Sequence, residues 1–110
     1  MGEIVATSPT MLRISLWENT TTTRNIMRSG QATLVAFSNN AACYIQLALT
    51  KLPDLPNAKH PRTRFAAEIV SSREDIAKYA DITSGVRIQL KDSAEVIERW
   101  EQVLQELFQD

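Results

Sequence analysis

The chain has few of the residues that build covalent or metal-linked sites. Its 110 residues include one cysteine, Cys43, and one histidine, His60. A single cysteine cannot form an internal disulfide, which favours a reducing, cytoplasmic location. We predict no metal site, because a lone histidine has no second imidazole or thiol beside it. His60 is expected in an exposed loop, and Cys43 as a small buried hydrophobic residue.

The sequence also lacks an excess of charge and a long apolar run. Twelve Lys and Arg residues oppose thirteen Asp and Glu residues, so no net field would steer the chain to nucleic acid or to an anionic membrane. No apolar run approaches the roughly 18 to 20 residues that cross a bilayer. We therefore expect a soluble protein with neither a nucleic-acid nor a membrane partner. The length fits one domain that spans residues 1–110.

Regular alternation of apolar and polar residues indicates that strands dominate the chain. Three of its four prolines fall within Leu52–Pro61, which predicts a surface loop there. We expect Ala42–Leu52 to be a central strand covered on both sides, because apolar residues occupy both of its faces. The predicted strands are Glu3–Ala6, Met11–Trp17 (half-buried), Ala32–Ser38, Ala42–Leu52, Arg64–Ser72 and Val86–Leu90.

Turn and cap signals complete the predicted architecture. The Ser38-Asn39-Asn40 segment tolerates the positive φ of a tight hairpin turn. Three helices are expected: one that begins at Asn19 or Thr20 and ends at Gly30, a short one over Glu74–Ala80, and an amphipathic one over Ser93–Phe108 that is capped by Asp92. The fold class is therefore α+β, an antiparallel sheet with an inserted helix and a C-terminal helix.

A threonine-rich turn opens the first of these helices. The hydroxyls of Thr20, Thr21 and Thr22 and the guanidinium of Arg24 lie at a helix N-terminus, where unpaired N–H groups and the helix dipole favour an anion such as phosphate. Helix capping by one hydroxyl, with a solvated arginine, explains the same residues. Trp17 just before this turn can stack on a ligand ring or pack against the end of the sheet.

The remaining polar residues form no recognisable catalytic set. Arg62 and Arg64 flank a threonine beside the proline-rich loop; we expect both to be solvated, with added positive charge near a phosphate as the other possibility. No serine has a histidine and an aspartate arranged around it. Catalytic side chains are therefore not identified from the sequence.

The order of these elements resembles the pyridoxamine 5′-phosphate oxidase-like family of split barrels that bind flavin mononucleotide (FMN). The similarity lies in short matches that cover roughly two-thirds of the chain, over Leu12–Leu16, Thr20–Gly30, Ala32–Phe37 and Tyr44–Leu49, and more weakly over Phe65–Asp75. It implies an antiparallel split β-barrel, dimerisation, and FMN held in a groove between subunits. It also places the flavin phosphate at Thr20, Thr21, Thr22 and Arg24.

The resemblance leaves two functions open. One is an FMN-dependent oxidoreductase of unknown substrate, in which the cofactor carries the redox chemistry. The other is a non-enzymatic homodimeric split barrel that has lost its flavin, which is favoured by Thr22 at a position usually basic in the family and by Gln46-Leu47-Ala48 where a glycine is common. A haem-binding role would depend on His60 alone. Compared with the family, we expect this chain to lack the N-terminal helix and strand hairpin, which leaves an open strand edge for a partner.

Overall fold

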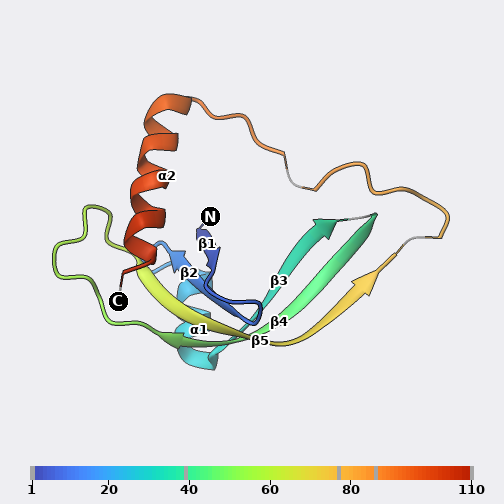
Figure 1. The fold of residues 1–110 in the computed structure, drawn as a ribbon, viewed down its shortest axis with the longest axis horizontal. Helices are drawn as coiled ribbons and strands as arrows, with labels where there is room; N and C mark the ends of the chain where they lie inside the picture. Colours follow the sequence, from blue (N-terminus) through green and yellow to red (C-terminus); the bar gives the residue numbers. More distant parts are fainter. Residues whose placement is uncertain (1, 39, 77, 86, 110) are drawn as a thin grey trace.

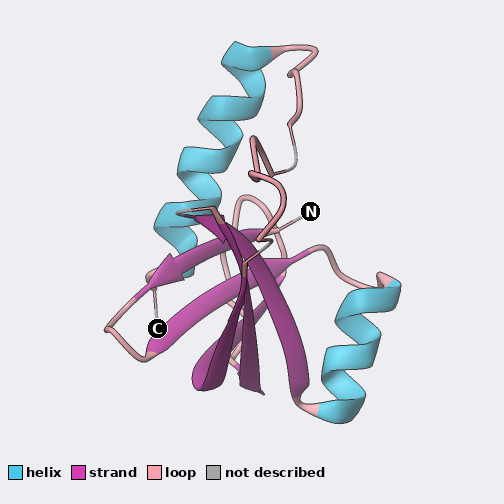
Figure 2. Cartoon of the chain, turned by 90° about the vertical axis from the view of Figure 1, so that its right-hand side faces the viewer, coloured by secondary structure: helices cyan, strands magenta, loops and turns pink. Residues whose placement is uncertain are grey.

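One curled antiparallel sheet and two helices make up the part of the protein that the structure describes (Figure 1). The computed structural model describes residues 2–38, 40–76, 78–85 and 87–109. The sheet has the order β1-β2-β5-β4-β3 and curls into half of a barrel (Figure 2). Its elements are β1 (Glu3–Ala6), β2 (Met11–Leu16), α1 (Thr21–Ser29), β3 (Gln31–Ser38), β4 (Ala41–Lys51), β5 (Thr63–Asp75) and α2 (Ser93–Leu107). The predicted α+β class with an antiparallel sheet is confirmed.

The hairpin of β3 and β4 forms as predicted. Ser38 pairs with Ala41, and Asn40 has the positive φ of 60° that the tight turn requires. β4 lies between β3 and β5, so its central position is also confirmed. The prediction that β4 is covered on both sides is wrong at one end, where Gln46, Ala48 and Thr50 are exposed. The helix on this side of the sheet is α2. It packs against β1 and β2 and leaves these residues of β4 uncovered.

The main core lies on the face of the sheet that α1 covers. Phe65 at its centre is 1% exposed, and it packs with buried residues of β2, β4 and β5. Ile26 is the residue through which α1 joins this cluster. Gly30 ends α1 with a φ of 68°, and its N–H donates to the carbonyl oxygen of Ile26 at 2.8 Å. This left-handed termination confirms the predicted end of the helix.

The opposite face of β2 is covered by the C-terminal turn of α2. Arg13 Nη1 donates to the carbonyl oxygens of Leu107 (3.2 Å) and Gln109 (2.9 Å). Arg64 is buried and donates to the carbonyl oxygens of Gln109 and Pro53. The solvated position predicted for Arg64 is therefore wrong, because the last carbonyls of a helix attract cations. The prediction of a half-buried β2 is also wrong, because the C-terminal turn of α2 packs on the second face of this strand.

The C-terminal helix begins where the sequence predicts. Asp92 Oδ1 accepts a hydrogen bond from the Glu95 N–H at 3.2 Å, which caps the first turn of α2. Val103 and Leu107 are the buried residues of its apolar stripe. Within the described residues, neither helix combines the length and the apolar character needed to cross a membrane.

Two predicted elements are wrong in the part of the chain that the structure describes. Glu74 and Asp75 continue β5 because they pair with Cys43 and Ala42 of β4, and these ladder bonds outweigh local helix propensity; no helix follows at residues 76 and 78–80. Residues 87–90 form no strand, since no neighbouring strand is there to pair with them. Ala77 and Val86, which belong to these predictions, lie outside the described residues.

Candidate functional site

The start of α1 is fixed by a short chain of hydroxyl groups. Thr20 is the N-cap: its Oγ1 accepts from the Thr23 N–H at 3.2 Å and donates to Thr23 Oγ1 at 2.9 Å. Thr23 Oγ1 in turn donates to the carbonyl oxygen of Trp17 at 2.7 Å. The capping interpretation of Thr20 is thus confirmed. These bonds hold the end of β2 and the first turn of α1 in one fixed arrangement.

The next two threonines lie in the first turn of α1, where backbone N–H groups have no partner within the helix. Thr21 and Thr22 are exposed, and the first turn of α1 contains no acidic residue. Their backbone N–H groups have no acceptor four residues earlier within the helix, as at every helix start. Arg24 is also exposed, one position after the buried Thr23. The geometry therefore provides donors and positive potential, with no carboxylate in that turn to repel an anion.

Trp17 contacts both this helix start and Arg62. Its carbonyl oxygen belongs to the threonine network, while its ring is stacked under the Arg62 guanidinium, whose carbon is 3.7 Å from the ring centroid. A cation this close to an indole face is attracted by the ring quadrupole. The solvated position predicted for Arg62 is therefore wrong. The indole is still 48% exposed, which leaves part of the ring open to a ligand.

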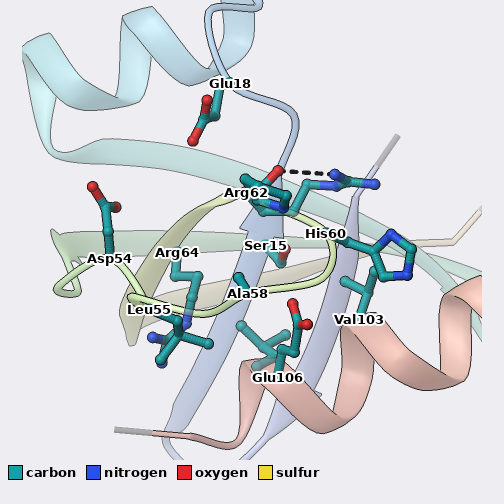
Figure 3. A pocket seen from close by; sticks show the side chains of 12 residues that line it. Ser15, Glu18, Asp54, Leu55, Ala58, His60, Arg62, Arg64, Val103 and Glu106 are labelled. Atoms are coloured by element: carbon teal, nitrogen blue, oxygen red, sulfur yellow. Dashed lines mark hydrogen bonds between the residues drawn. The ribbon is translucent and has the colours of Figure 1, made fainter.

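A small cavity lies between the proline-rich loop and the C-terminal half of α2 (Figure 3). Its volume is about 100 Å³, too small for most metabolites. Glu18, Asp54 and Glu106 bring carboxylates to it from three segments of the chain (Figure 3). His60 also lines it, but Nε2 lies 2.6 Å from Gln102 Oε1 and the ring is half-buried. The exposed position predicted for His60 is wrong, because the loop packs against α2.

A larger cavity of about 570 Å³ is lined by Trp17 and lies between β1, residues 88–90 and α2. Trp100 and Glu3 line it as well. Burial raises the pKa of the Glu3 carboxyl, and the nearby guanidinium groups of Arg62 and Arg99 partly offset that effect. Its Oε2 is buried without a hydrogen-bond partner within the described part of the chain. Among the described residues, no three His, Cys, Asp or Glu side chains are placed to hold a metal ion.

The structure brings the predicted site residues together only in part. Trp17, Thr20, Thr21, Thr22 and Arg24 all lie at the junction of β2 and α1, but the hydroxyl of Thr20 is already used as the cap. The site residues predicted from the sequence do not include Thr23 or Glu3, and Arg62 was considered only as a solvated residue or as added positive charge near a phosphate. Thr23 could have been found as the fourth hydroxyl of the run, whereas nothing local indicates that Arg62 and Glu3 approach Trp17.

Fold and site together define an α+β protein with a curled antiparallel sheet and an anion-favouring helix start at the end of its second strand. No protein-family model matches the chain. The chain is 51% identical over 106 residues to the uncharacterized protein YclD of Bacillus subtilis (strain 168). The match covers 96% of this chain and 69% of YclD. The chain therefore belongs to the same family as YclD.

Proposed function

We propose that this protein binds FMN in a split barrel of the pyridoxamine 5′-phosphate oxidase-like kind and acts as an oxidoreductase. The observation that carries the proposal is the exposed first turn of α1, where Thr21 and Thr22 face solvent and no acidic residue is present. A phosphate placed there would accept hydrogen bonds from backbone N–H groups and hydroxyls. Arg24 would add a charge-assisted hydrogen bond from its exposed guanidinium.

The position of Trp17 supports the same proposal. Its backbone is hydrogen-bonded to the start of α1, while its half-exposed indole lines the larger cavity. A ligand with a phosphate at one end and a flat ring at the other would use both features. The flavin would supply the electron-transfer chemistry when bound. The curled sheet with a helix inserted between β2 and β3 is compatible with a split barrel.

A comparison of FMN with riboflavin tests the phosphate site. Thr22→Glu places a carboxylate in the first turn of α1, which suits the helix dipole but repels phosphate. We expect FMN affinity to fall at least about tenfold, because the added carboxylate repels the phosphate and the Thr22 hydroxyl is lost as a donor, while riboflavin affinity and the melting temperature stay unchanged. Arg24→Ala is expected to weaken FMN in the same way. Quenching of flavin fluorescence measures both affinities.

Arg28→Ala is the matched control for these variants. Arg28 lies in the last turn of the same helix, and its guanidinium donates to Asn25 Oδ1 at 3.0 Å. Its removal should leave FMN binding unchanged. The proposal fails if the wild-type protein neither contains nor takes up FMN, or if Thr22→Glu binds FMN as tightly as wild type. A stable dimer without flavin binding would instead support the non-enzymatic split-barrel module.

The edge strand β3 supports a homodimer under either function. It has one neighbour in the sheet, β4, and its sequence from Gln31 to Ser38 contains no charged residue and no proline. Val35 and Phe37 are exposed on it. An uncharged edge of this kind is a template for pairing with another chain.

Val35→Lys tests this interface by light scattering. A lysine on an edge strand opposes strand pairing, so we expect a wild-type particle of about twice the 12.4 kDa chain mass and a monomeric variant. Val70→Lys is the control, because Val70 is also exposed but lies on β5 inside the sheet. A wild-type monomer, or equal dissociation by both lysines, would contradict pairing through β3.

A further inference from the structure

The described part of the chain between β5 and α2 runs past the end of the β3–β4 hairpin (Figure 1). Residues 81–85 of this connection lie against the hairpin end, and we call them the strap. Residues 82–85 line a cavity of about 200 Å³ together with Phe37, Ser38 and Asn40. The strap forms no helix or strand, so its position depends on its contacts with the hairpin.

One side chain of the hairpin turn, Asn40, makes two hydrogen bonds to the strap. Its Oδ1 accepts from the Ile82 N–H at 2.5 Å, and its Nδ2 donates to Asp81 Oδ1 at 3.3 Å. An asparagine amide offers one acceptor and two donors, so it can bind a backbone group and a side chain at once. This amide therefore joins two successive residues of the strap to the turn between β3 and β4.

Apolar contacts accompany these hydrogen bonds. Ala42 is 8% exposed, although Ala48 on the same face of β4 is exposed. Ile82 is the half-buried residue of the strap, and it lines a cavity of about 420 Å³ with Ala42. Gly85 lies close to the Phe37 ring, because a Cβ added to it would be 2.8 Å from Phe37 Cδ2. The strap thus packs on the ends of both hairpin strands.

The strap lies where a partner strand would pair with the end of β3. Phe37 and Ser38 are the last two residues of β3, so a strand that pairs along the whole of β3 must lie beside both. Neighbouring strands are about 4.8 Å apart, and strap residues packed against Phe37 and Ser38 occupy that space. Pairing along all of β3 therefore requires the strap to move away.

We propose that the strap is autoinhibitory and restrains the pairing of β3 with a second copy of this chain. While Asn40 binds the strap, a partner strand is excluded from the end of β3. When the strap is released, the edge is open from Gln31 to Ser38. The proposal rests on the homodimer inferred above and adds a contact that controls it. Since only the released form pairs fully, the apparent affinity of the dimer falls with the fraction of released chains.

Asn40→Gly tests this control, because glycine accepts the φ of 60° in the turn and removes both side-chain hydrogen bonds. Loss of one net hydrogen bond raises the released fraction about fivefold. We therefore expect the dissociation constant of the dimer, measured by sedimentation equilibrium, to fall at least about fivefold. Asn19→Gly is the matched control. Asn19 has a φ of 61°, and its side chain makes no hydrogen bond within the described residues, so this variant should dimerise like wild type.

Hydrogen exchange of the Ile82 amide reports on the strap independently of the dimer, since this N–H donates to Asn40. In dilute, monomeric protein, Asn40→Gly should speed this exchange at least about fivefold. Gly85→Ala is a second variant that leaves Asn40 in place. Its added methyl group would collide with the Phe37 ring, so we expect it to release the strap and to strengthen the dimer as well.

Three results would overturn the proposal, and they differ in what else they affect. If wild type dimerises and Asn40→Gly does so with equal or lower affinity, the strap does not restrain pairing and the homodimer still stands. If neither protein dimerises, the homodimer fails together with the proposal. If the Ile82 amide exchanges equally fast in both proteins, Asn40 does not hold the strap.

Discussion

Phe65→Ala lowers the free energy of unfolding by about 3–5 kcal/mol, the cost of emptying a buried aromatic site. Phe65 is 1% exposed at the centre of the cluster that joins β2, β4, β5 and α1. Its neighbours belong to a continuous sheet, so the backbone has little freedom to close the cavity. A loss of this size is a large part of the stability of a small domain. Urea denaturation followed by circular dichroism measures it.

Val70→Ala is the control for this prediction. Val70 lies on the same strand, five residues away, and is 65% exposed. Its replacement should change the free energy of unfolding by less than about 0.5 kcal/mol. Equal effects of the two variants would contradict the placement of the core on the face that α1 covers.

Leu107→Ala is expected to cost about 2–5 kcal/mol and to loosen α2 from the sheet. Leu107 is 1% exposed, and its carbonyl oxygen accepts a hydrogen bond from Arg13. Because the larger cavity has one wall on α2 that includes Trp100, displacement of this helix would also open that cavity. We therefore expect the tryptophan emission to change at a lower urea concentration than the circular dichroism of the sheet.

Phe108→Ala distinguishes burial from mere removal of an apolar side chain near the C-terminus. Phe108 follows Leu107 directly and is 57% exposed. Its loss should leave both transitions within about 0.5 kcal/mol of wild type. If Phe108→Ala destabilises as much as Leu107→Ala, α2 does not pack through the face described above.

The parts of the fold that depend on neighbouring residues were predictable from the sequence. Thr20 and Asp92 cap helices, and Gly30 ends one, because these bonds and φ values involve residues within one turn of the chain. The hairpin at Asn40 is equally local. The predictions at Glu74–Ala80 and Val86–Leu90 failed because a sheet partner overrode local preference in one segment and was missing in the other.

Only the part of the candidate site that lies within one short stretch of the sequence was predictable. The sequence alone shows that hydroxyls and an arginine meet at the start of α1, since Thr20 to Arg24 are within one turn of helix. Three long-range contacts become visible only in the folded chain: Arg62 covers Trp17, Arg64 binds the end of α2, and Glu3 lines a cavity with both tryptophans. Residue spacing along the chain determines which side chains share one face of a helix or a strand. Contacts across tens of residues depend instead on strand order and on which face of the sheet each helix covers.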